Sequence, residues 1–196
     1  MRAKGLKKGH VFVISGPSGG GKTTVVERLC QKLPRLIRSV SVTTRKPRPK
    51  ERPGKDYQFV SVDVFNVMIR EKQLLEWAAV HEAYYGTPKQ PVISALNRCR
   101  DVVLSIDVQG AQQIQWALGK RAILIFLMPP SMEQLRERLQ QRKTEAPAAI
   151  ERRLAVARQE MVCASWYDHA VINDELEHAV SRVLAIIQGV RTKGRK

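Results

Sequence analysis

The sequence has few cysteines and no long apolar segment. Its three cysteines lie far apart among the 196 residues and form no CxxC pair: Cys30, Cys99 and Cys163. This pattern excludes a disulfide framework and a zinc site built on paired cysteines. The longest apolar run, Ala122–Met128, is much shorter than the roughly 20 residues that a membrane span requires. We therefore expect a cytoplasmic protein without a membrane partner, and a chain long enough to bury its own core.

Acidic residues are scarce, and none lies near either end of the chain. There are 18 Asp and Glu residues against 34 Lys and Arg residues, which gives a net charge of +16. Residues 1–10 and 191–196 carry four basic residues each, which is half of that charge. Basic ends of this kind bind polyanions without specificity. We therefore expect nucleic acid only as a non-specific partner of these ends. A homo-oligomer is compatible with the sequence but is not indicated by it.

Apolar strand patterns alternate with helical patterns along most of the chain. Val11–Ser15 is a β-branched apolar run that ends at glycines, which is typical of a buried parallel strand, and a helix should follow it through about Leu33. Further strands are expected at Val102–Val108, Arg121–Met128 and Ala170–Ile172, and further helices at Pro91–Arg100, after Ser131, at Pro147–Val162 and at Leu176–Gln188, ending near Gly189. This alternation predicts an α/β fold with a parallel sheet flanked by helices.

The stretch from about residue 40 to residue 90 breaks this alternation. It predicts short strands at Ser39–Val42, Tyr57–Ser61 and Leu75–Val80, with one short helix around Phe65–Arg70. We interpret it as a small β-rich insertion attached to the same core. Trp77 and Trp116 are expected to belong to the core rather than to stack on a base.

One glycine-rich segment predicts a phosphate-binding loop. Gly16–Thr23 fits the Walker A pattern Gly-x4-Gly-Lys-Thr, with a predicted strand before it and a helix after it. Glycines let successive backbone N–H groups turn toward a phosphate at the positive end of the following helix. We expect Lys22 to bridge the β- and γ-phosphates and Thr23 to bind Mg²⁺. The pattern predicts a purine nucleoside triphosphate site made of Gly16, Pro17, Ser18, Gly19, Gly20, Gly21, Lys22, Thr23 and Thr24.

The loop alone does not identify the group that receives the phosphate. Motors, GTPases, transporters and small-molecule kinases all share it. The chain contains no N/T-K-x-D motif of the kind that GTPases use for guanine, and it is shorter than most of these proteins. Its length and its compact insertion favour a nucleotide or metabolite kinase.

Further motifs in a fixed order resemble the guanylate kinase family. They are Ser41-Val-Thr-Thr-Arg45-Lys-Pro-Arg48, Gly54-Lys-Asp-Tyr57-Gln-Phe59, Leu75-Glu76-Trp77-Ala78, Tyr84-Tyr85-Gly86-Thr87 and Ile106-Asp107-Val108-Gln109-Gly110-Ala111, followed by Pro129-Pro130-Ser131, Arg142, Arg153 and Asn173-Asp174. The resemblance covers about residues 9–188. It implies transfer of the γ-phosphoryl group of ATP to GMP with Mg²⁺ as cofactor. It also implies three parts: a P-loop core (1–39, 91–131 and 161–196), a GMP-binding insertion (40–90) and a helical lid (132–160).

The resemblance assigns roles to individual residues. It implies that Lys22, Arg45, Arg142 and Arg153 are catalytic, the last two as lid arginines, and that Asn173 lies near the adenine of ATP. The implied GMP-binding residues are Ser41, Arg45, Arg48, Tyr57, Glu76, Tyr85, Thr87 and Asp107.

The chemistry of these residue types fits a guanine nucleotide. A glutamate such as Glu76 can accept both N1–H and N2–H₂ of guanine, while hydroxyls of Ser41 and Thr87 could donate to O6. Adenine would leave that carboxylate unpaired, and such mispairing costs orders of magnitude in selectivity. The arginines suit bidentate phosphate binding. No residue stands out as a general base, and none is needed, because a phosphate monoester with a second pKa of about 6 is already mostly deprotonated at neutral pH.

One departure from the family pattern leaves alternatives open. The family usually has Asp-x-Asp in the strand after the insertion, whereas this chain has Ser105 before Asp107. A hydroxyl cannot replace the missing charge. We expect an active guanylate kinase. An inactive guanylate-kinase-like interaction module, which Ser105 supports, and a P-loop kinase for another phosphorylated acceptor remain as alternatives.

Overall fold

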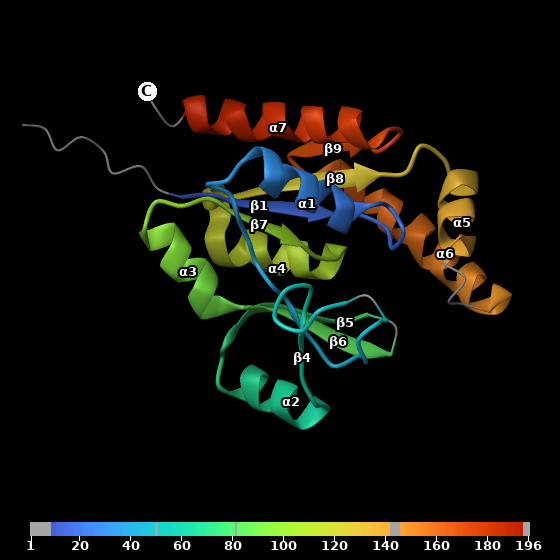
Figure 1. Cartoon of the computed structure of the whole chain (residues 1–196), viewed down its shortest axis with the longest axis horizontal. Helices are drawn as coiled ribbons and strands as arrows, with labels where there is room; N and C mark the ends of the chain where they lie inside the picture. The colour runs from blue at the N-terminus through green and yellow to red at the C-terminus, as the bar shows by residue number, and fades with distance from the viewer. Residues whose placement is uncertain (1–8, 50, 81, 142–145, 194–196) are drawn as a thin grey trace, which may run out of the picture.

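The computed structural model describes residues 9–49, 51–80, 82–141 and 146–193. Its centre is a five-stranded parallel sheet (Figure 1). The strand order is β2 (Ile37–Arg38), β7 (Val102–Ser105), β1 (Val11–Ser15), β8 (Ala122–Met128) and β9 (His169–Ile172). The expected α/β fold with a parallel sheet flanked by helices is confirmed.

Helices cover both faces of this sheet, as Figure 1 shows. Successive residues of β1 point to opposite faces, so Phe12 and Ile14 pack in one layer and Val11 and Val13 in the other. The first layer lies under α1 (Lys22–Lys32) and α7 (Leu176–Lys193), and the second under α3 (Lys89–Asn97) and α4 (Val108–Leu118). Because both faces are buried, the first four residues of the strand, Val11–Ile14, are all apolar. Two short 3-10 turns, Gly119–Arg121 and Cys163–Trp166, lead into β8 and toward β9.

The insertion forms a second, smaller sheet beneath the first (Figure 1). Its strand order is β4 (Gln58–Phe59), β3 (Val42–Thr43), β6 (Ala83–Pro88) and β5 (Leu74–Val80), and α2 (Val62–Arg70) packs on it through Phe65. The pairs β3–β6 and β5–β6 are antiparallel, whereas β3–β4 is parallel. The expected β-rich stretch is present.

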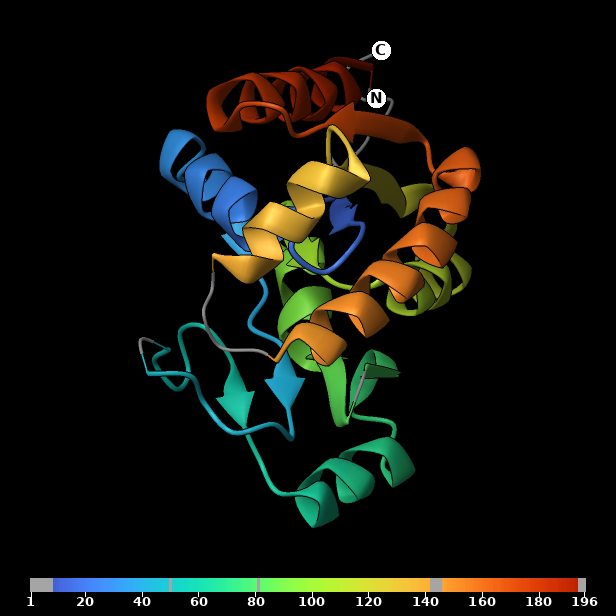
Figure 2. The same ribbon diagram turned by 90° about the vertical axis from the view of Figure 1, so that its right-hand side faces the viewer.

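Two helices, α5 (Met132–Gln140) and α6 (Pro147–Val162), form a third packing unit. Their contact is a separate apolar cluster made of Leu135, Leu139, Ile150, Leu154 and Ala157. Figure 2 shows α6 extending from the core toward the insertion. No helix of the described residues is long and apolar enough to cross a membrane.

Several element boundaries differ from the sequence-based expectations. The strand expected to reach Val108 ends at Ser105, because Asp107 is the N-cap of α4. The last helix was expected to end near Gly189, which is wrong. It continues to Lys193, where Arg191 Nε donates to Asp101 Oδ2 at 2.7 Å and ties the final turn to the core. The pattern reading did not find β2, β6 or α4.

The placement of two tryptophans in the core is also wrong. Trp116 is 75% exposed and Trp77 is 39% exposed. Trp116 lies on the outer face of α4, whose inner face is buried through Ala111 and Ile114. Trp77 lies on β5, where alternate side chains point away from the core.

Candidate active site

The glycine-rich loop between β1 and α1 packs tightly against neighbouring backbone. Gly16, Gly19 and Gly21 have φ values of 135°, 91° and 89°, a region that favours glycine. A Cβ on Gly16 would lie 2.3 Å from the carbonyl oxygen of Leu127 on β8. The loop is therefore held in one shape by the core sheet, with the N-terminus of α1 directly behind it.

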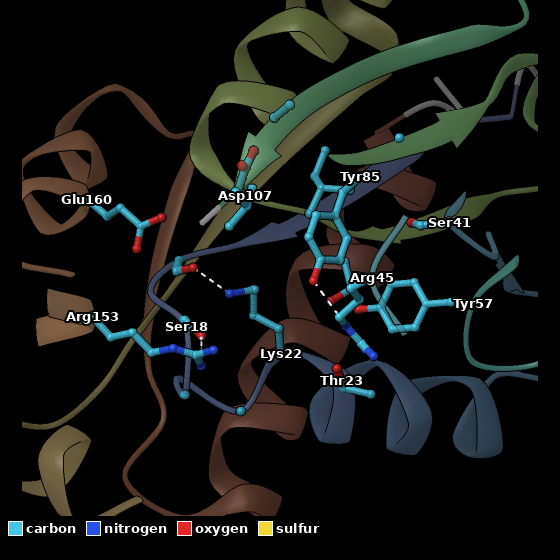
Figure 3. Close-up of a pocket in the computed structure, with 18 of the residues that line it drawn as sticks. Ser18, Lys22, Thr23, Ser41, Arg45, Tyr57, Tyr85, Asp107, Arg153 and Glu160 are labelled. Carbon is cyan, nitrogen blue, oxygen red and sulfur yellow. Dashed lines mark hydrogen bonds between the residues drawn. The ribbon is translucent and has the colours of Figure 1, made fainter. Parts of the chain in front are cut away.

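Lys22 and Thr23 begin α1 at the mouth of this loop (Figure 3). The Lys22 ammonium donates to the carbonyl oxygens of Gly16 at 2.5 Å and Pro17 at 3.0 Å. The first turn of α1 contains no acidic residue, so nothing in it offsets the positive end of the helix dipole. The loop, the lysine and the helix end together form a site for a negatively charged phosphate chain.

A single cavity of about 210 Å³ joins this loop to the insertion. It brings together most of the residues singled out from the sequence (Figure 3). The predicted site residues that line it are Gly16, Ser18, Gly19, Gly21, Lys22, Thr23, Thr24, Ser41, Arg45, Arg48, Tyr57, Glu76, Tyr85, Asp107 and Arg153. Four predicted residues do not line it: Pro17, Gly20, Thr87 and Asn173. Arg142 lies outside the described residues.

Glu76 on β5 is a buried acid at the insertion side of the cavity. Only 4% of the residue is exposed. The hydroxyl of Thr87, itself fully buried, donates to Glu76 Oε1 at 2.6 Å, so its proton is directed to the carboxylate rather than into the cavity. Burial raises the pKa of Glu76 to about 7; the hydrogen bonds from Thr87 oppose this shift, and the charge of Asp107 adds to it. Oε1 of Glu76 is therefore hydrogen-bonded to Thr87, and the carboxylate as a whole is shielded from solvent.

Arg45 is held in place by a carboxylate that the sequence reasoning missed. Its Nη1 and Nη2 donate to the two oxygens of Glu51, each at 2.6 Å, and its Nε donates to Tyr85 Oη at 3.1 Å. The guanidinium carbon lies 5.0 Å from the ring centre of Tyr57 and 5.7 Å from that of Phe59. The bond to Arg45 lowers the pKa of Glu51 despite its partial burial. The planar group is thus held by both oxygens of Glu51 and the hydroxyl of Tyr85, and it lies against the rings of Tyr57 and Phe59.

Glu51 also holds the loop that carries Arg48. The backbone N–H of Arg48 donates to Glu51 Oε2 at 2.8 Å. A signal for this role was present in the sequence, because Glu51 is the one acidic residue between Lys46 and Pro53. A lone acid in a basic loop is well placed to pair with an arginine that must keep a fixed position.

Asp107 lies on the core side of the cavity, at the start of α4. Its Oδ1 accepts the backbone N–H of Gly110 at 2.8 Å, whereas its Oδ2 is buried and has no hydrogen-bond partner among the described residues. Burial raises the pKa of Asp107, and the N–H of Gly110 and the charge of Lys22 oppose this shift. Ser105 lines the cavity at the end of the preceding strand. An orphaned carboxylate oxygen and the Thr23 hydroxyl, which lines the same cavity, are hard oxygen donors that fit a magnesium ion or its bound waters.

The described residues contain no cluster of three or more His, Cys, Asp or Glu side chains that could hold a metal ion on its own.

Glu160 on α6 is a further acid in the cavity that sequence reasoning missed. Burial raises its pKa to about 7, although the charge of Lys22 opposes the shift. Figure 3 shows its side chain pointing toward the cavity from the side of α6.

The α5–α6 unit contacts the phosphate-binding loop at two points. Arg153 Nη1 donates to Ser18 Oγ at 3.2 Å, and a Cβ on Gly19 would lie 3.0 Å from side-chain atoms of Leu135 and Leu139. Arg138 Nη2 donates to the carbonyl oxygen of Asn173 at 2.9 Å. The unit therefore bears directly on the loop.

Asn173 lies behind the loop rather than in the cavity. It is 6% exposed, and its Nδ2 donates to the carbonyl oxygen of Gly20 at 2.8 Å. A Cβ on Gly21 would lie 2.3 Å from the same nitrogen. In this structure the amide supports the loop, and its expected place near the adenine of ATP stays a prediction.

The parallel sheet, the phosphate-binding loop and the cavity shared with the insertion place the chain in the class of P-loop kinases. Comparison with known proteins narrows this class. The chain belongs to the guanylate kinase family, whose profile matches residues 8–190.

Individual relatives cover nearly the whole chain. It is 49% identical over 186 residues to guanylate kinase of Gloeobacter violaceus, covering 93% of this chain and 90% of that one. It is 45% identical to guanylate kinase of Wolbachia sp. subsp. Brugia malayi, covering 95% of each. The crystal structure of guanylate kinase from Anaplasma phagocytophilum superposes with a TM-score of 0.80 at 31% identity, covering 97% of this chain and 88% of that one.

Proposed function

We propose that the protein is an active guanylate kinase that transfers the γ-phosphoryl group of ATP to GMP. An oxygen of the GMP phosphate attacks the γ-phosphorus, a new P–O bond forms, and the bond to the β,γ-bridging oxygen breaks to release ADP and GDP. The observation that carries this proposal is one cavity with a buried carboxylate, Glu76, at one side and the phosphate-loop lysine, Lys22, at the other. The high identity to proteins named guanylate kinase supports it over both alternatives, and no feature of the described residues favours an inactive module.

Glu76 would read the guanine base. Its carboxylate accepts N1–H and N2–H₂ of guanine, which replaces the solvent that burial has removed. Because the Thr87 hydroxyl already donates to Glu76, we assign the donation to guanine O6 to Ser41, which lines the same cavity. Adenine presents no matching pair of donors and would leave the buried carboxylate unpaired.

Four residues of the insertion would hold the GMP phosphate: Arg45, Arg48, Tyr57 and Tyr85. Glu51, Tyr57 and Phe59 fix the guanidinium of Arg45 before the substrate arrives, so little ordering is required on binding. The Tyr85 hydroxyl accepts from Arg45 and can direct its own proton to a phosphate oxygen.

The loop residues Gly16–Thr24 would hold the phosphates of ATP. Backbone N–H groups bind the β-phosphate, and Lys22 neutralises charge between the β- and γ-phosphates. Thr23 and the free oxygen of Asp107 would hold Mg²⁺ directly or through water. When bound, the ion offsets negative charge on the transferring group.

We further propose that the chain works as a core (1–39, 91–131 and 161–196), an insertion (40–90) and a lid (132–160). The separate apolar cluster of α5 and α6 supports treating them as one moving unit. Closure of the lid would bring Arg153, and Arg142 with it, onto the phosphates and exclude water that would hydrolyse ATP.

An ADP-release assay with ATP and Mg²⁺ tests the proposal. GMP, AMP, CMP and UMP are compared as acceptors in the wild type and in Glu76→Gln, with Glu137→Gln, an exposed glutamate on α5, as the matched control. We expect turnover with GMP alone, and a fall of about 100-fold or more in kcat/KM for GMP in Glu76→Gln only. A folded wild type that forms no GDP would overturn the proposal, and equal use of AMP would overturn the role of Glu76.

A further inference from the structure

Strand β5, which carries Glu76, is an edge strand of the insertion sheet. It pairs with β6 on one side, and no described strand pairs with its other side. Its register with β6 shifts between Leu74 and Glu76, so the chain bulges directly before the buried acid. Edge strands with a bulge are poorly constrained by their own sheet, and bulges re-aim the side chains beside them. The position of Glu76 therefore needs support from outside the insertion.

That support comes from α4 of the core. The side chain of Gln113 binds the backbone of Trp77, the residue after Glu76, at two points. The Trp77 N–H donates to Gln113 Oε1 at 3.1 Å, and Gln113 Nε2 donates to the Trp77 carbonyl oxygen at 2.7 Å. The primary amide thus takes the place of one residue of a neighbouring strand.

One helical turn earlier on α4, Gly110 gives the carboxylate room. A Cβ on Gly110 would lie 2.4 Å from Glu76 Oε2 and 3.0 Å from Glu76 Cδ. Gly110 lies in the first turn of α4 and is buried, so a side chain at this position would meet the carboxylate instead of solvent. Residues three apart lie on one face of a helix, so Gly110 and Gln113 form a continuous seat for β5.

We propose that Gly110 and Gln113 are positioning residues for guanine recognition. They hold β5 on the core helix that begins at Asp107, and so set the distance between the guanine-reading carboxylate and the phosphate-binding loop. This rests on the proposed function, since it takes Glu76 as the guanine reader. Neither residue lines the cavity, so both act through Glu76 and not on the substrate.

Gly110→Ala tests the seat where it is tightest. We expect kcat/KM for GMP to fall by about 100-fold, the cost typical of a misplacement of about 1 Å, with KM for ATP unchanged. Gly189→Ala is the matched control, because Gly189 also lies within a helix and a Cβ there meets nothing within 4 Å. A fall in ATP binding equal to the fall in GMP binding would overturn the proposal.

A second pair of variants separates positioning from loss of structure. In the Gly110→Ala background, Glu76→Asp withdraws the carboxylate from the added methyl group. Calorimetry measures the affinity for GMP of the double variant and of the single variants Gly110→Ala and Glu76→Asp. The double variant should bind GMP at least as tightly as whichever single variant has the lower affinity. Additive losses would show that the glycine only stabilises the fold, and would overturn the proposal.

Gln113→Met removes both hydrogen bonds while keeping the length of the side chain. We expect a rise of about five- to tenfold in KM for GMP, with KM for ATP unchanged. Gln112→Met, at an exposed neighbour on the same helix, should leave both KM values unchanged. If Glu76→Gln impairs GMP use while Gly110→Ala and Gln113→Met do not, this proposal fails and the proposed function stands. If Glu76→Gln has no effect on GMP use, Glu76 does not read guanine, and the positioning proposal fails with it.

Discussion

The two sides of the cavity are built in different ways. The loop side is one continuous run, Gly16–Thr24, in which backbone groups, helix geometry and one lysine form the site. The insertion side draws single side chains from β5, β6 and two loops, and each depends on a partner elsewhere: Glu76 on Thr87 and α4, and Arg45 on Glu51. One short segment therefore supplies the groups that bind phosphate, whereas the side chains on the insertion side come from several separate segments of the chain.

The largest effect is expected on the loop side. Lys22→Met removes the charge between the transferring phosphates, and we expect kcat to fall by about 1,000-fold or more. The melting temperature should stay close to that of the wild type, because the Lys22 ammonium donates to the carbonyl oxygens of Gly16 and Pro17 in the loop and its replacement leaves the apolar core intact. GDP formation under saturating substrates measures the change, with Lys32→Met, at the far end of the same helix, as control. A variant that retains a tenth of the activity would contradict this assignment.

The buried acid makes stability depend on pH on the insertion side. The pKa of Glu76 is about 7 in the folded protein against 4.5 in a free side chain, so folding takes up a proton between these values. The free energy of unfolding should therefore fall as pH rises from about 4.5 to 7, by at most about 3 kcal/mol for this group. Urea titrations from pH 5 to pH 8 measure it.

A neutral side chain supplies the comparison for that experiment. Glu76→Gln should lose this part of the pH dependence, so its stability relative to the wild type should increase toward pH 8. Glu160, whose pKa burial also raises to about 7, contributes with the same sign, and Glu160→Gln should show a similar gain. Parallel curves for wild type and both variants would show that these acids are not buried in solution.

The partner of Arg45 provides a smaller test. Glu51→Gln keeps the shape of the side chain but leaves one of the two guanidinium bonds without its charged acceptor. We expect KM for GMP to rise about tenfold while KM for ATP is unchanged. Glu71→Gln, on the same insertion, is the control. A lower KM for GMP would mean that Glu51 competes with the phosphate instead of holding Arg45 for it.

The smallest effect is expected behind the loop. Asn173→Ala leaves the Gly20 carbonyl oxygen without its amide donor, and we expect KM for ATP to rise about threefold to tenfold, with KM for GMP unchanged. Asn97→Ala, at the exposed end of α3, is the control. An equal rise in both KM values would break the division between the two sides of the cavity.

The helices and strands that could be predicted from the sequence were those defined by a short stretch of neighbouring residues. The strand Val11–Ser15 and the helix Pro147–Val162 match the structure at both ends, because each is defined by its own hydrophobic pattern and a proline or glycine boundary. Helix α4 was missed because its positions read as part of a motif, and the end of α7 was misplaced because Arg191 pairs with Asp101, 90 residues away. No local signal reports such a contact.

The sequence by itself determined the phosphate-binding loop and the α/β alternation, since each depends on neighbours within a few positions. The order of its motifs, through their resemblance to the guanylate kinase family, indicated the residues of the guanine site. Only the tertiary structure decided that Glu76 is buried against Gly110, that Glu51 holds Arg45, and that Asn173 supports the loop from behind. The physical reason is that burial and hydrogen-bond pairing depend on which surfaces meet. Residues that the chain separates by 34 or 153 positions meet only after the sheets and helices have packed.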